Sequence, residues 1–127
     1  MDELVSRVAD ALGVDATVAR TAIGHVLAFL LKESPDGPVT EFMDRTPGSR
    51  AAVEAVDSGG DAGGGSVLGG LLGGGLMGLA GKLNAAGLDM NQIRKLGHEI
   101  LAHAETVVGK DKVREIADRI PGLSQFL

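Results

Sequence analysis

The chain has 127 residues, carries a formal net charge of −5 and contains no cysteine, tryptophan or tyrosine. The length suits one compact domain, and a chain without cysteine is excluded from disulfide, thiolate and cysteine-ligated metal chemistry. With three phenylalanines as its whole aromatic content, the core must be aliphatic, which favours close helix packing, so we expect an all-α protein.

Charge is distributed unevenly along the chain. Residues 1–61 hold five basic and eleven acidic residues, a balance of −6, whereas residues 82–127 hold seven basic and six acidic residues, a balance of +1. Because an acidic half that lacks stacking aromatic residues suits a phosphate backbone poorly, we expect no nucleic-acid partner. Asp2 and Glu3 replace the basic residues of a secretory signal, so the expected location is the cytoplasm.

Helical spacing of apolar residues predicts two helices at the start of the chain. The first covers residues 2–12, with Asp2 and Glu3 in the first turn, where the helix dipole favours anions. Gly13-Val14-Asp15 can end this helix and cap the next, which should run to about Glu33, before the breakers of residues 34–38.

Two shorter helices are expected before a glycine-rich stretch. One runs from Pro38 or Val39 to about Arg45, because proline suits the first turn of a helix and Pro47-Gly48 ends it. Ser49 can cap the second, which ends before the glycines that follow Ser58.

The second half predicts three further helical segments. Residues 82–86 continue a helix to Gly87, and Asp89 with Gln92 forms the pattern of a capping box at the start of a long helix that ends near Gly109. Residues 113–120 form a short amphipathic helix closed by Pro121-Gly122.

The chain aligns with itself at an offset of 74 residues. The best block sets VTEFMDRTPG (residues 39–48) against VREIADRIPG (residues 113–122) without a gap. The identities fall on Ala11/Ala85, Gly13/Gly87, Asp15/Asp89, Leu27/Leu101, Ala28/Ala102, Val39/Val113, Glu41/Glu115, Asp44/Asp118, Arg45/Arg119, Pro47/Pro121 and Gly48/Gly122. This pattern favours two copies of one three-helix module, although amphipathic helices with similar caps also align with one another.

Two phosphate-binding motifs are matched only in part. The segment from Gly73 to Gly78 fits GxGxxG, but neither the preceding strand nor the later acidic residue of a dinucleotide site accompanies it. Gly81-Lys82 lacks the serine or threonine that a P-loop places next. We therefore expect no cofactor.

His98-Glu99-Ile100-Leu101-Ala102-His103 resembles a zinc-protease helix at first sight. Its histidines are five residues apart, however, about 140° around a helix, so both cannot chelate one ion from one face. Glu99 and His103 are four apart and remain the weak metal candidates, with an ion pair or solvated side chains as the simpler interpretation. No other pattern indicates a catalytic site, and we expect a non-enzymatic protein.

The uncharged stretch from Ala62 to Gly81 is half glycine. Its twenty residues are long enough to span a bilayer, but five leucines contribute about 0.3 to 0.6 kcal/mol each to insertion. As an exposed helix, ten glycines would cost roughly 10 kcal/mol relative to alanine. Small residues spaced by four would instead let another helix approach closely.

We therefore predict a glycine-faced helix over about residues 66–86 that packs on other helices, preceded by a linker at residues 58–65. The N-terminal helical module then covers residues 1–57 and the C-terminal module residues 66–127, within one compact domain. The candidate self-association residues are Gly69, Gly70, Leu72, Gly73, Gly74, Leu76 and Gly78.

The run GLLGGGLMGLAGKLNAAGLD, the helix after it and the ending ADRIPGL resemble small bacterial domains of unknown function, including YidB-like ones. This resemblance covers roughly residues 66–125 and implies a bacterial all-helical protein without an established activity.

Three functions remain open on the sequence. The first is a non-enzymatic interaction or self-assembly protein that binds itself or a protein partner. The second is a carrier that holds a small apolar ligand or lipid between the two modules. The third is membrane association through the glycine and leucine segment.

Overall fold

A computed structural model describes residues 2–33, 37–60 and 76–119, and these residues form helices with no strand among them. The helices are α1 (Asp2–Leu12), α2 (Ala16–Glu33), α3 (Pro38–Arg45), α4 (Ser49–Gly60), α6 (Leu76–Ala85), α7 (Met90–Val108) and α8 (Lys110–Arg119). The prediction of an all-α protein is confirmed.

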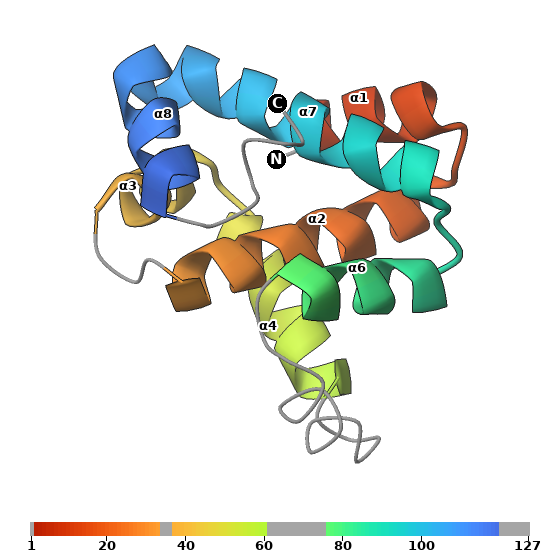
Figure 1. Ribbon diagram of the computed structural model, residues 1–127. Coiled ribbons are helices and arrows are strands. Elements are labelled where there is room, and N and C mark those ends of the chain that lie inside the picture. Colours follow the sequence, from red (N-terminus) through yellow and green to blue (C-terminus); the bar gives the residue numbers. More distant parts are fainter. Residues whose placement is uncertain (1, 34–36, 61–75, 120–127) are drawn as a thin grey trace.

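The helices pair across the middle of the sequence (Figure 1). We refer to α1–α4 as the N-terminal half and to α6–α8 as the C-terminal half. α1 lies along α7, and α6 lies along α2, so the first helix of each half packs on the second helix of the other. α3 and α8 pack together beside α7, while α4 packs on α2 and projects away from the rest.

The two halves share one hydrophobic core. Its most deeply buried apolar side chains come from five of the helices and from the junction before α7: Leu4, Val8, Ile23, Leu27, Val39, Leu83, Leu88, Leu96 and Ile100. A shared core of this kind links the stability of each half to the presence of the other.

Most predicted helix ends agree with the structure within a residue or two. α2 ends at Glu33, α3 covers Pro38–Arg45, and α7 ends before Gly109. α8 begins earlier than predicted, at Lys110. α4 continues to Gly60, so the predicted start of the linker, at residue 58, falls within this helix. Residues 61–65 of that linker, and residues 66–75 of the predicted glycine-faced helix, lie outside the described part of the chain.

The turn that ends the first helix recurs at the end of α6. Gly13 and Gly87 both adopt positive φ, 69° and 104°, which glycine tolerates best. The next residue then bonds back five positions: Val14 N–H donates to the Ala9 carbonyl at 3.0 Å, and Leu88 N–H donates to Leu83 at 3.1 Å. These bonds satisfy carbonyls that the helix ends leave open.

α2 and α4 approach each other closely at Gly24. A Cβ atom at this position would lie 2.6 Å from the Ala52 carbonyl oxygen and 2.9 Å from a methyl carbon of Val56. Real Cβ atoms do not come so near to backbone oxygen, so the side-chain hydrogen of glycine is what permits this crossing. The role of Gly24 is not visible in the sequence, where it stands inside a helix between Ile23 and His25.

Ser49 differs from its predicted role as a cap of α4. Its hydroxyl is fully buried and lies 2.7 Å from the Thr46 carbonyl oxygen and 3.0 Å from that of Met43. The hydroxyl therefore donates backwards to the end of α3 rather than accepting from the first turn of α4. Carbonyls left open where α3 ends need a donor, and this need decides the direction of the bond.

None of the described helices is by itself both long and apolar enough to span a bilayer. α1 and the Ala16–Leu31 part of α2 together satisfy the same criterion of length and apolar character, but the chain bends by 108° between them. Most of the glycine and leucine segment that prompted the membrane interpretation, residues 61–75, lies outside the described residues.

Candidate functional site

The predicted self-association residues fall mostly outside the described part of the chain. This applies to Gly69, Gly70, Leu72, Gly73 and Gly74. Leu76 and Gly78 belong to the first turn of α6, where the structure gives the backbone and not the side-chain surroundings. Their proposed role in packing therefore stays a prediction.

The last two turns of the predicted glycine-faced helix are described. Leu79 is 9 % exposed and Leu83 is 1 % exposed, and both belong to the shared core. Gly81 lies on the other side of α6, where an added Cβ would have nothing within 4 Å. In this part of α6 the leucines point inward and the glycine face is open.

Glu99 and His103, the weak metal candidates, make separate contacts on α7. The Glu99 carboxylate pairs with the Arg7 guanidinium of α1 at 3.4 Å. The His103 ring makes a T-shaped contact with the Phe42 ring of α3, with centroids 6.0 Å apart and planes at 88°. Within residues 2–33, 37–60 and 76–119, no three His, Asp or Glu side chains are grouped so that they could hold a metal ion.

His103 has an altered tendency to bind a proton. Partial burial between helices lowers its pKa from the ordinary value, and the nearby carboxylate of Glu3 opposes this effect. Arg7 and the chain's amino terminus act in the same direction as burial. The imidazole is therefore neutral in the folded protein at pH 7, which suits its edge contact with Phe42.

This lowered pKa predicts a loss of stability in acid. The unfolded chain binds a proton at His103 at a higher pH than the folded chain does, so stability falls as pH drops below about 6.5. The difference between the urea midpoints of unfolding at pH 7.5 and pH 5.5 should therefore be smaller for His103→Gln than for the unmodified protein. The exposed histidine of the same helix, in His98→Gln, is the matched control. An unchanged pH dependence in His103→Gln would contradict this assignment.

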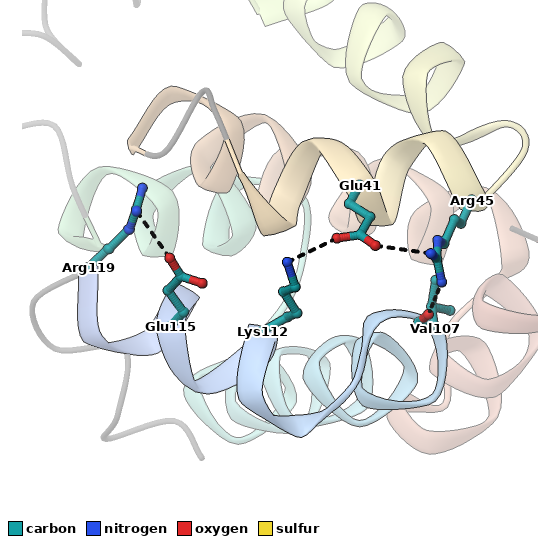
Figure 2. A network of polar contacts seen from close by, with 6 residues as sticks. All are labelled: Glu41, Arg45, Val107, Lys112, Glu115 and Arg119. Atoms are coloured by element: carbon teal, nitrogen blue, oxygen red, sulfur yellow. Dashed lines mark hydrogen bonds and ion pairs between the residues drawn. The ribbon is translucent and has the colours of Figure 1, made fainter.

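A polar network joins α3 to α7 and α8 (Figure 2). Glu41 contacts two cations, Arg45 at 3.0 Å and Lys112 at 3.4 Å. Arg45 also donates to the Val107 carbonyl oxygen at 3.1 Å, near the end of α7, where a positive charge is favourable. The network therefore fixes α3 of one half against both C-terminal helices of the other.

The same ion pair recurs in α8. Glu115 and Arg119 lie 3.1 Å apart, four residues from each other, as Glu41 and Arg45 do. Asp44 pairs with Arg50 of α4 and not with its neighbour in the sequence. In both helices the arginine that follows this aspartate in the sequence pairs with the glutamate one helical turn earlier.

Gln92 supplies a contact that sequence reasoning missed. The predicted capping box is confirmed, because Gln92 N–H donates to the Asp89 carboxylate at 2.8 Å and Asp89 N–H donates to the Gln92 side chain at 2.9 Å. The Gln92 amide also donates to the Leu12 carbonyl oxygen, 2.9 Å away at the end of α1. Only the fold brings these residues together, since they are 80 positions apart.

Comparison with known proteins gave no match to a protein-family model, a curated protein or a solved structure. The resemblance to YidB-like domains stays a prediction on the residues that carry it.

Proposed function

We propose that the protein is a non-enzymatic interaction and self-assembly protein whose glycine-faced helix packs against a second copy. The observation that supports this most directly is the orientation of α6. Leu79 and Leu83 are buried, whereas the position of Gly81 is open to solvent. A helix held from one side by leucines presents its small residues on the other, where a partner helix can approach closely.

We also propose that the chain is a duplicated three-helix module, in which α1–α3 correspond to α6–α8. When α1–α3 are shifted by 74 residues, α1 and α2 begin where α6 and α7 begin and end within one residue of them. α3 then ends where α8 ends and begins two residues later than α8. The pairs that are buried at both equivalent positions support the same register: Val5/Leu79, Ala19/Ile93, Ala22/Leu96, Val26/Ile100, Leu27/Leu101, Leu30/Ala104, Val39/Val113, Phe42/Ile116 and Met43/Ala117.

Local bonds add support for the duplication. The turns at Gly13 and Gly87 use the same back-bond, and the Glu41–Arg45 and Glu115–Arg119 pairs occupy equivalent positions. α4 has no counterpart among the described helices. The equivalent of Gly24, which α4 covers, is the exposed His98, so the second module carries a polar residue where the first carries a helix contact.

Self-assembly predicts a discrete oligomer that weakens when the glycine face is filled. Gly73→Leu and Gly74→Leu should each raise the concentration at which half of the oligomer has dissociated by about tenfold, since a bulky side chain prevents close helix approach. Light scattering after size-exclusion chromatography measures this, with concentration from refractive index because the chain lacks Trp and Tyr.

Met90→Ala is the control for the Gly73→Leu and Gly74→Leu variants, because Met90 is exposed at the start of α7 and does not belong to the glycine face. An unmodified chain that stays monomeric at every concentration would contradict self-assembly. If native mass spectrometry of that monomer revealed a co-purified apolar molecule, the carrier function would be favoured instead.

A further inference from the structure

All the most distant contacts of the described chain cross from one half to the other. They are the Arg7–Glu99 and Glu41–Lys112 ion pairs, the Gln92 to Leu12 and Arg45 to Val107 hydrogen bonds, and the Phe42–His103 ring contact. The close packing of α1 on α7 and of α6 on α2 crosses the same boundary. The interface between the halves is therefore extensive, apolar at its centre and polar at its rim.

The connection that joins the two halves is longer than the connections between neighbouring helices within each half. α1 and α2 are separated by residues 13–15, α3 and α4 by residues 46–48, and α7 and α8 by Gly109 alone. Between α4 and α6 the chain takes residues 61–75. None of the contacts across the interface depends on which chain supplies this connection.

We propose that a second copy of this chain can occupy the interface, so that α6–α8 of each copy pack on α1–α4 of the other in a reciprocally exchanged dimer. This inference rests on the proposed self-assembly and adds the interface between the halves to the glycine face as a surface that the second copy covers. An exchanged dimer repeats every contact of the closed monomer, so the balance depends on concentration and on the connection. Because both halves belong to one chain, their effective concentration is of the order of millimolar, which favours the closed monomer in dilute solution.

Two full-length variants with reversed charges test this exchange. The first, Arg7→Glu with Glu41→Lys, reverses the rim charges of the N-terminal half. The second, Glu99→Arg with Lys112→Glu, reverses those of the C-terminal half. Each variant alone places like charges at both ion pairs across its own interface.

When the two variants exchange halves, opposite charges meet at every one of these pairs. We therefore expect a mixture, unfolded together in urea and refolded at about 100 μM, to form a one-to-one heterodimer. Its yield should exceed that of the unmodified chain's exchanged dimer by about tenfold or more, since several like-charge contacts become attractive ones. Native mass spectrometry distinguishes the heterodimer by the masses of its two chains.

A third variant, which carries all four substitutions in one chain, is the matched control. It restores both pairs within a single molecule and should fold without heterodimer formation. It lacks the Glu41–Arg45 pair, as the first variant does, so the loss of that pair does not distinguish the two chains. If the two variants fold only when mixed, the exchange is supported equally. If the mixture contains separate monomers, or if neither variant folds in the mixture while the four-substitution chain does, the exchange is wrong.

This experiment and the glycine experiment can fail separately. Heterodimer formation from the charge-reversed variants depends on α1, α3, α7 and α8, whereas Gly73→Leu acts on the glycine-rich stretch. If Gly73→Leu abolishes the oligomer and the charge-reversed variants form no heterodimer, the exchanged dimer is wrong and self-assembly through the glycine face is supported. If the charge-reversed variants form the heterodimer equally well when both also carry Gly73→Leu, the exchanged dimer is supported and only the proposed role of the glycine face is wrong.

Discussion

Replacing Leu96 with alanine should lower the free energy of unfolding by about 2–5 kcal/mol, the range for a large aliphatic side chain removed from a core. Leu96 is completely buried on α7, a helix that packs on α1, α2, α3, α6 and α8. Against a total stability of about 5–15 kcal/mol for a domain, this loss is large. The location of the amide groups that lose protection from hydrogen exchange in Leu96→Ala is the more informative result.

Because the halves share one core, Leu96→Ala should loosen both of them together. Hydrogen exchange measured by mass spectrometry should show faster exchange in α2 as well as in α7, and urea unfolding followed by circular dichroism should remain a single transition. Met90, 54 % exposed at the start of α7, provides the control, since Met90→Ala should change stability by less than about 0.5 kcal/mol. Unaltered exchange in α2 would mean that the halves unfold independently.

Gly24→Ala has the second largest expected effect, although it adds only one methyl group. That methyl would be placed 2.6 Å from the Ala52 carbonyl oxygen, which belongs to the backbone of α4 and cannot rotate away. Overpacking of this kind costs about 1–3 kcal/mol, of which the better helix propensity of alanine recovers up to about 1 kcal/mol. With that recovery subtracted, the expected net loss is at most about 2 kcal/mol, or a fall in Tm of up to about 8 °C.

The same substitution at Gly81 should have the opposite sign. Gly81 lies within α6, and its added methyl would have nothing within 4 Å. Helix propensity then acts alone and Gly81→Ala should stabilise the protein by about 0.5–1 kcal/mol. Thermal unfolding of both variants followed by circular dichroism at 222 nm measures the contrast. Equal shifts for Gly24→Ala and Gly81→Ala would show that α4 does not approach α2 as described.

The helices of this protein are predictable from local signals. Apolar spacing places the buried face of α7, the Asp89–Gln92 capping box marks its start, and Gly13, Gly87 and Gly109 mark helix ends, where the structure finds positive φ. These features depend on residues a few positions apart, so a single sequence contains them.

The contacts that join the helices are not local and could not be read in this way. No sequence pattern around Arg7 predicts its ion pair with Glu99, and none around Gln92 predicts its hydrogen bond to Leu12. The hydroxyl of Ser49 had two possible directions, and the open carbonyls at the end of α3 decided between them. Of the candidate site, the sequence indicated which histidine and glutamate to consider, but their separate partners, Phe42 and Arg7, depend on the tertiary fold.

The pairing of α1 with α7 has a consequence for synthesis on the ribosome. α1 is made first, whereas the helix that lies along it is completed only at Val108. At 5–20 residues per second, the roughly 50 residues between the end of α4 and the end of α7 take about 2–10 s. Throughout that interval α1, whose Leu4 and Val8 are fully buried in the finished protein, lacks α7 as its neighbour. The nascent chain therefore exposes apolar surface that can bind other chains before the fold is complete.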